Sequence, residues 1–305
     1  MTGVRPPQER FARIGDVELC YETFGDPAGR PLLLVMGLAT QMIAWHEDFC
    51  GQLVDRGFHV IRFDNRDIGR STHFHEHPPP TMVELLTRRP RDPAYTLSDM
   101  AADAAGLLEH LEIGSAHVTG ASMGGMIAQA IAAEHPSRVR SLVSIMSTTG
   151  SAWVGRPALR AYPVLLSRGR RGRDAYVERA QQVYRLIGSP AFPRDPDHLR
   201  ELAGLSYDRG VTAGGVGRQL AAILASGDRT AMLRRIRAPT LVVHGSADRL
   251  VSTSGGRATA RAIPGARLAL IDGMGHDLPR GAWPRLIDGI EETARRGERA
   301  PAAVG

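Results

Sequence analysis

Residues 120–124 have the sequence Gly-Ala-Ser-Met-Gly, which places a serine between glycines two positions away on either side. A short predicted strand at 116–119 precedes this motif, and a helical pattern at 123–135 follows it. A serine held on a sharp strand-to-helix turn stands above the sheet edge, but its backbone is strained and its neighbours must be small. The pattern therefore predicts that Ser122 is a nucleophile, rather than an inert serine in a glycine-rich turn.

A serine hydroxyl is a weak nucleophile and needs a neighbouring base. After a turn of this kind the chain order is serine, acid, histidine. Only His276 follows the last predicted strand, so we expect it to be the base. Asp248, on a short turn after a predicted strand at 240–243, is the expected acid; Asp272 is its competitor, although that residue is better placed to cap or to form a salt bridge.

A tetrahedral oxyanion needs fixed hydrogen-bond donors. One expected donor is the backbone N–H of Met123, at the start of its helix. The other is expected in the loop after residues 32–35, where we favour the N–H of Leu38, with Gly37 providing the turn. Trp45 and His46 follow closely and are candidate pocket residues, with ordinary core packing as the alternative for Trp45.

Strands alternate with helices along most of the chain, which predicts a mainly parallel sheet flanked by helices on both faces. Expected strands are 17–22, 32–35, 59–63, 116–119, 142–145, 240–243 and 266–271, and expected helices are 97–111, with Ser98 as N-cap, 123–135 and 284–295.

The stretch from 150 to 237 interrupts this alternation, because it contains helical patterns at 174–187, 196–205 and 216–225 but no convincing buried strand. We interpret it as a helical cap inserted before the strand at 240–243, where it would cover the site. The expected division is a core of 1–149 and 238–297, a cap of 150–237 and a flexible tail of 298–305.

Composition excludes several classes of protein. The 305 residues are 43% hydrophobic and contain no apolar run long enough to span a membrane, and the N-terminal residues suggest no signal peptide. Cys20 and Cys50 cannot form a disulfide framework, so we expect a reducing cytoplasm. The net charge of +6 comes from scattered arginines mixed with acids, and despite an arginine-rich segment at 168–173 we do not expect nucleic-acid binding.

Two other polar segments have simpler explanations than chemistry. The charges of residues 64–71 are expected to brace a loop, although contact with substrate is the alternative. His73, His75 and His77 precede three prolines and have no second ligand cluster, so we expect no metal there. No cofactor is expected.

Together these motifs resemble the α/β-hydrolase family over nearly the whole chain outside the insertion. The segment 33–37, the stretch from His59 to Ser71 and the Gly-Met-Gly-His motif at 273–276 are similar to the branch that contains aclacinomycin methylesterase, an enzyme of anthracycline tailoring. The resemblance implies a triad of Ser122, Asp248 and His276, oxyanion donors at Leu38 and Met123, and a helical cap over residues 150–237.

The expected function is cofactor-independent hydrolysis of a small hydrophobic carboxylic ester through an acyl-enzyme, with a methyl ester of a polyketide-like secondary metabolite as the narrower expectation. A serine at position 122 disfavours epoxide hydrolases and haloalkane dehalogenases, which have aspartate there. Lactonases, C–C bond hydrolases, amidases and perhydrolases share the triad and stay open, as does a non-catalytic receptor for a small molecule. The oligomeric state is left open.

Overall fold

The computed structural model describes residues 8–158, 172–212 and 214–299. Within them, eight strands form one sheet in the order β1-β2-β4-β3-β5-β6-β7-β8, in which β1 and β2 are antiparallel to their neighbours and all other pairs are parallel. The strands are β1 Arg10–Ile14, β2 Val17–Phe24, β3 Arg30–Val35, β4 Phe58–Phe63, β5 Ala116–Ala121, β6 Val139–Ile145, β7 Thr240–Gly245 and β8 Arg267–Ile271.

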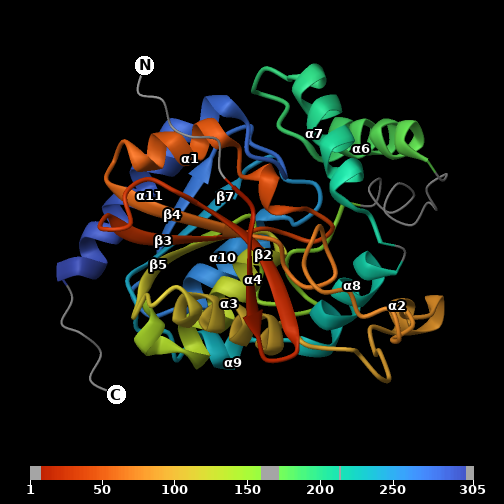
Figure 1. Cartoon of the computed structure of the whole chain (residues 1–305), viewed down its shortest axis with the longest axis horizontal. Helices are drawn as coiled ribbons and strands as arrows, with labels where there is room; N and C mark the ends of the chain where they lie inside the picture. The colour runs from red at the N-terminus through yellow and green to blue at the C-terminus, as the bar shows by residue number, and fades with distance from the viewer. Residues whose placement is uncertain (1–7, 159–171, 213, 300–305) are drawn as a thin grey trace.

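Helices cover both faces of the sheet (Figure 1). Helices α1 and α11 pack on one face with an apolar cluster that includes Phe49 and Leu286, and α3, α4 and α9 pack on the other with a cluster that includes Met100 and Ile127. The helices are α1 Glu47–Val54, α2 Met82–Thr87, α3 Leu97–His110, α4 Met123–Glu134, α6 Arg173–Ile187, α7 Pro196–Arg209, α8 Gly215–Ser226, α9 Thr230–Leu233, α10 Thr253–Ala262 and α11 Trp283–Arg299.

The central strands are buried along their whole length because helices cover both of their faces. Every residue of β4, β5 and β7 is buried. Parallel pairing aligns the strand ends: Val35 of β3 lies opposite Gly120 of β5, and Gly245 of β7 lies opposite Ile271 of β8. The loops that follow these strands therefore leave the sheet along one edge.

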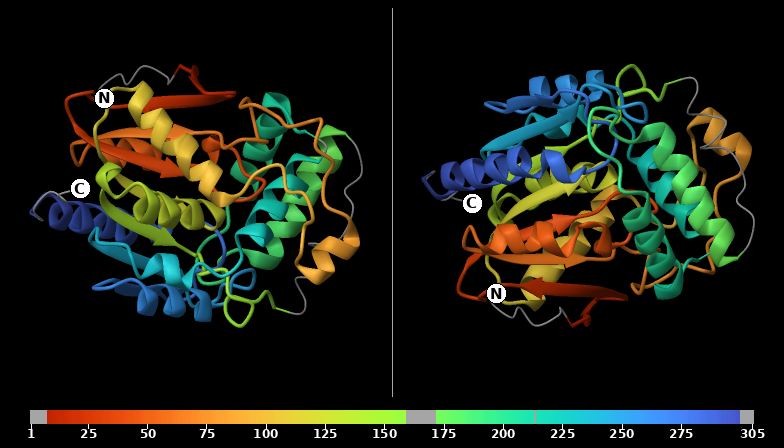
Figure 2. Two further views of the ribbon diagram at one scale, coloured as in Figure 1. Left: turned by 90° about the horizontal axis from the view of Figure 1, so that it is seen from below. Right: turned by 90° about the horizontal axis from the view of Figure 1, so that it is seen from above.

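Helices α6, α7 and α8 all lie in the chain between β6 and β7, as the predicted insertion requires. Figure 2 shows them grouped at the end of the sheet toward which the parallel strands point. The predicted α/β fold with a helical insertion before residues 240–243 is confirmed. The structure describes 150–158 and 172–237 of the expected cap apart from residue 213, so most of the arginine-rich segment 168–173 lies outside the described residues.

Two local predictions were wrong. Thr96 rather than Ser98 caps α3: its hydroxyl accepts from the Asp99 N–H and Asp99 bonds back to the Thr96 N–H, whereas the Ser98 hydroxyl donates to Glu134. The expected tail beginning at residue 298 was also set too early, because α11 continues to Arg299. None of the helices in the described residues is both long and apolar enough to cross a lipid bilayer.

Candidate active site

Ser122 lies at the turn between β5 and α4 with φ of 56° and ψ of −120°, a region that side chains with a Cβ rarely adopt. Its glycine neighbours make the turn possible. A Cβ on Gly120 would lie 2.1 Å from the Gly124 carbonyl oxygen, and a Cβ on Gly124 would lie 2.1 Å from the Val35 carbonyl oxygen. The tight contact of strand, turn and helix leaves the Ser122 side chain partly exposed at the sheet edge.

Three side chains that are distant in sequence meet at this edge. The His276 Nε2 atom lies 2.9 Å from the Ser122 Oγ atom, and its Nδ1 atom lies 2.8 Å from an Asp248 carboxylate oxygen. Asp248 follows β7 and His276 follows β8, and the pairing of these strands brings their loops together. The structure thus connects carboxylate, imidazole and hydroxyl in one hydrogen-bonded series.

The Asp248 carboxylate is buried, and both of its oxygens have hydrogen-bond partners. Its Oδ1 atom accepts from the N–H groups of Leu250 and Val251, at 2.9 and 2.8 Å. Burial by itself would raise the pKa of this carboxyl, but the charge of His276 and hydrogen bonds from His244 and His276 outweigh it and hold the pKa well below its usual range. Asp248 is therefore ionised and can stabilise a positively charged His276.

His244 lies beside the Asp248 carboxylate, and because it precedes the last strand it was not a candidate for the base. Its Nε2 atom lies 2.8 Å from the Val251 carbonyl oxygen and 3.5 Å from the Asp248 Oδ2 atom, and the ring is completely buried. The only signal in the sequence is its position four residues before Asp248, at the end of the same strand. Asp272, the competing acid, accepts instead from the Ser246 hydroxyl at 2.8 Å.

The two expected oxyanion donors lie at the same edge of the sheet as Ser122. Met123 is the first residue of α4, where N–H groups have no partner within the helix. Gly37 directly follows Met36 at the end of β3, and a Cβ built on it would lie 3.6 Å from the Ser122 Oγ atom. Within the described residues, the N–H groups of Leu38 and Met123 donate to no other group, so both are free to bind an oxygen.

Of the three residues predicted to line the pocket, one lies beside Ser122 and two do not. Gly37 lies against Ser122, as stated above, but Trp45 does not line a pocket: it is completely buried and stacks on Phe49 in the core. Trp45 lies close to the site in sequence because it follows β3 shortly. Its ring, however, packs in the apolar cluster between α1 and the sheet. His46 caps α1 and contacts Arg280 and His198, and within the described part of the chain it has no hydrogen bond, ion pair or ring contact with the triad.

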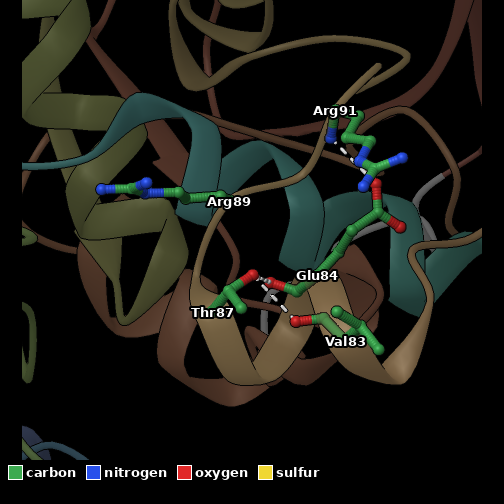
Figure 3. Close-up of a pocket in the computed structure, with 5 residues that line it drawn as sticks. All are labelled: Val83, Glu84, Thr87, Arg89 and Arg91. Atoms are coloured by element: carbon green, nitrogen blue, oxygen red, sulfur yellow. Dashed lines mark hydrogen bonds between the residues drawn. The ribbon is translucent and has the colours of Figure 1, made fainter.

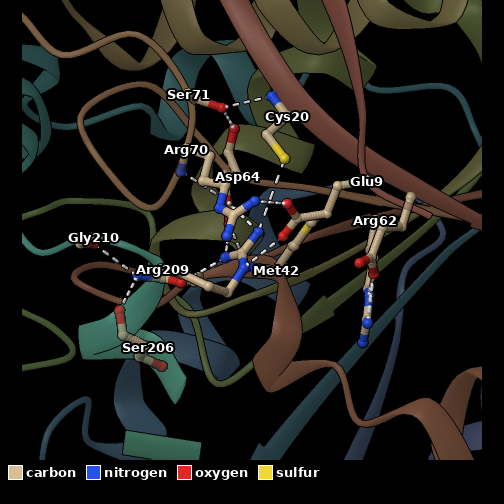
Figure 4. A network of polar contacts seen from close by, with 12 residues as sticks. Glu9, Cys20, Met42, Arg62, Asp64, Arg70, Ser71, Ser206, Arg209 and Gly210 are labelled. Carbon is tan, nitrogen blue, oxygen red and sulfur yellow. Dashed lines mark hydrogen bonds and ion pairs between the residues drawn. The ribbon is translucent and has the colours of Figure 1, made fainter. Parts of the chain in front are cut away.

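The acids of the loop after β4 brace the cap. Asp64 accepts from Arg209 of α7 at 3.0 Å and from the Met42 N–H at 2.7 Å, and both charged side chains are almost completely buried. Figure 4 shows this network, which Glu9 and Gln41 complete. The charges of residues 64–71 thus brace their loop, as predicted, through partners in the cap such as Arg209 and partners in the core such as Asp103.

The cysteines and the histidine-rich loop form no second reactive site among the residues that the structure describes. Burial raises the pKa of the Cys20 and Cys50 thiols to about 12, which keeps both protonated and poorly nucleophilic. No cluster of three or more histidine, cysteine or acidic side chains able to hold a metal occurs among the residues that the structure describes. His73 instead lies 3.0 Å from the Gly69 carbonyl oxygen.

A surface cavity of about 580 Å³ lies beside α2, lined by Val83, Glu84, Thr87, Arg89 and Arg91 (Figure 3). It contains none of the triad residues. The Glu84 carboxylate is already occupied by Thr81 and by the Arg91 N–H. We therefore assign this cavity no part in the chemistry at Ser122.

These features define an α/β architecture with a hydrogen-bonded Ser-His-Asp series at the sheet edge, and the comparison with known families agrees with a hydrolase. Residues 30–279 match the family model described as the alpha/beta hydrolase fold. The chain belongs to the α/β-hydrolase family.

Individual relatives narrow the comparison. A rhodomycin D methylesterase of Streptomyces peucetius is 30% identical over 90% of this chain and 94% of its own length. Among solved structures, an esterase of Thermogutta terrifontis has a TM-score of 0.67 at 25% identity, covering 95% of this chain and 99% of its own. An enol-lactonase of Burkholderia xenovorans has a TM-score of 0.68 at 23% identity, covering 95% and 100%, and shows the fold alone.

Proposed function

We propose that this protein is a serine esterase in which Ser122, His276 and Asp248 form the catalytic triad. The observation that carries the proposal is the geometry of His276, whose two ring nitrogens lie 2.8 Å from Asp248 and 2.9 Å from Ser122. A neutral imidazole held in this way has its Nδ1–H donated to the carboxylate and its Nε2 lone pair directed at the hydroxyl.

The reaction runs in two halves. As the Ser122 Oγ atom bonds to the ester carbonyl carbon, its proton passes to His276 Nε2, and the N–H groups of Leu38 and Met123 bind the oxyanion. Collapse of this intermediate breaks the bond to the leaving alkoxide, which takes the proton from His276 and departs as the alcohol. Water then loses a proton to His276 and attacks the acyl-enzyme; the new intermediate collapses, His276 returns the proton to the Ser122 Oγ atom, and the acid is released.

The identity to a rhodomycin D methylesterase along nearly the full chain supports a methyl ester as the substrate bond. We propose a small hydrophobic methyl ester on a polyketide-like scaffold, which would yield methanol and a carboxylic acid. The buried, free thiols of Cys20 and Cys50 support a cytoplasmic location.

The test uses three kinds of substrate and one covalent probe. The wild-type protein should hydrolyse p-nitrophenyl acetate and be labelled by a fluorophosphonate, and Ser122→Ala should lose at least about 10³-fold in kcat and all labelling. Release of methanol from aromatic methyl esters, with slower turnover of matched lactones, would support the proposed methylesterase activity. Equal activity of wild type and Ser122→Ala would remove Ser122 from the mechanism, and preference for the lactone would replace the ester by the lactonase alternative.

A further inference from the structure

Gln219 is a fully buried amide side chain on the cap helix α8, and it is not part of the proposed triad. Its Oε1 atom accepts from the Ala39 N–H at 3.1 Å, and its Nε2 atom donates to the Arg66 carbonyl oxygen at 2.9 Å. Burying an amide is costly unless both ends are hydrogen-bonded. Because both ends are paired here, the side chain has one fixed orientation.

The loop that Gln219 contacts is the one that carries the Leu38 N–H. Ala39 has φ of 61°, in the left-handed region, and the Thr40 N–H donates to the Gly37 carbonyl oxygen at 3.3 Å. In a trans peptide the N–H points opposite to the C=O. Since the Gly37 oxygen is turned toward Thr40, the Leu38 N–H of the same peptide points away from the turn.

The hydrogen bond from Ala39 to Gln219 has a specific consequence for this loop. The adjacent residues Leu38 and Ala39 each have one backbone N–H. The Ala39 N–H is bonded to Gln219, whereas the Leu38 N–H has no acceptor among the described residues. Gln219 also holds Ala39 in a strained conformation that a free loop would leave. The direction of the Leu38 N–H therefore depends on a side chain from the cap.

Helix α8 is firmly anchored next to Gln219. The preceding residue, Arg218, is 3% exposed and binds both oxygens of the buried Asp67 carboxylate at 2.7 and 2.8 Å. The Tyr95 hydroxyl donates to the same carboxylate at 2.7 Å. A bidentate arginine pair fixes both distance and orientation, so Gln219 is presented to the loop from a rigid base.

We infer that Gln219 is a positioning residue for the oxyanion hole, through which the cap helix α8 orients the Leu38 N–H toward the tetrahedral intermediate. The inference rests on the proposed esterase function. It makes the cap a part of the catalytic apparatus as well as a cover for the substrate.

The test replaces Gln219 by methionine, which has similar length but neither hydrogen bond. Complete loss of an oxyanion donor lowers kcat by about 10²- to 10³-fold, so a displaced donor should lower it by about 10- to 100-fold. KM should stay within about two-fold, because the contact is made in the transition state. Affinity for an aryl trifluoromethyl ketone, which forms a tetrahedral adduct with a catalytic serine, should fall by the same factor as kcat/KM.

Two further variants keep the test decisive. Gln182→Met makes the same change at an exposed position of α6, where among the described residues Gln182 bonds to Glu178 alone, and should leave all three quantities unchanged. Gln219→Asn keeps the amide but is one methylene too short to bridge the Ala39 N–H and the Arg66 oxygen. It should fold and show the same signature at reduced size, even if the methionine variant does not fold.

Rates are referred to active sites counted by fluorophosphonate labelling, which separates folding from catalysis. Unchanged kcat and unchanged ketone affinity in Gln219→Asn would overturn the inference, as would a rise in KM with kcat preserved. A wild-type protein that neither reacts with the fluorophosphonate nor hydrolyses esters would instead refute the proposed function, and the two failures are distinguishable.

Discussion

Replacing Asp248 by asparagine exchanges one carboxylate oxygen for an NH₂ group and should disable His276. The Asp248 Oδ1 atom accepts two backbone N–H groups, from Leu250 and Val251, so the asparagine oxygen must occupy that position. The asparagine NH₂ then faces His276 Nδ1, where the carboxylate Oδ2 atom was. A donor at this position forces Nδ1 to accept, and the ring proton moves to Nε2. In that tautomer Nε2 cannot take the proton of Ser122.

The magnitude follows from this tautomer and from the lost charge. In Ser-His-Asp triads the wrong tautomer lowers kcat by about 10⁴-fold, which corresponds to about 5.4 kcal/mol of transition-state stabilisation. The inverted orientation of the amide does not rescue the enzyme, because the NH₂ group would then face the two backbone N–H groups and leave all three donors unpaired. We therefore expect a loss of about 10⁴-fold in kcat in Asp248→Asn.

The assay is steady-state hydrolysis of p-nitrophenyl acetate, with folded protein verified by circular dichroism. Asp272→Asn is the matched control, because Asp272 bonds to Ser246 and has no contact with His276; its kcat should stay within about two-fold of wild type. A large loss in Asp272→Asn, or a loss below about ten-fold in Asp248→Asn, would refute the assignment of the acid.

Three further predictions concern stability. Gly124→Ala should destabilise the protein by about 1–3 kcal/mol or more in urea unfolding, because its Cβ would lie 2.1 Å from the Val35 carbonyl oxygen, against the 3.0 Å that real contacts respect. Burial lowers the pKa of His117 to about 4, so between pH 6.5 and 4 the unfolded chain binds a proton that the folded one does not; stability should fall by at most about 3 kcal/mol on acidification across this window, and His117→Gln should remove that part of the fall. Arg218→Met should cost about 3–5 kcal/mol, because it leaves the buried Asp67 carboxylate without its counter-ion.

Two of these predictions have a matched control on the same chain. Gly51→Ala lies within α1 with no atom inside 4 Å of the new Cβ, and should be neutral or slightly stabilising. Arg200→Met breaks only an exposed pair with Asp197 and should change stability by less than about 1 kcal/mol. Equal costs in these controls, or an unchanged acid response in His117→Gln, would contradict the burial arguments.

The residues at the sheet edge were predictable because their positions follow from local patterns and chain order. Ser122 sits on a turn that only small neighbours allow, and the loops of Asp248 and His276 each follow a strand in a parallel sheet. Aligned parallel strands bring such loops to the same edge whatever the length of chain between them. Distance along the sequence therefore did not obscure the site.

What could not be predicted depends on packing between distant elements. Helix α10 was missed because its sequence contains two adjacent glycines, which are poor helix formers; those glycines let the helix approach Thr148 and His244 closely. Trp45 follows the oxyanion loop closely, yet its ring lies in the core. No sequence periodicity distinguishes a buried glutamine such as Gln219 from an exposed one. Its burial depends on the hydrogen-bond partners that the facing loops supply, here the Ala39 N–H and the Arg66 carbonyl oxygen.

The buried charges between cap and core have a role that their energies alone would not indicate. Removing two charges from water offsets most of their attraction, so the pairs Arg209–Asp64 and Arg218–Asp67 contribute little net stability when formed. A displaced cap would leave those buried carboxylates unpaired, which is costly, so the pairs select one docking position over its neighbours. Asp64 also binds the Met42 N–H, just beyond the oxyanion loop, and Gln219 follows Arg218 directly. The position of the cap and the shape of the loop are thus set by the same contacts.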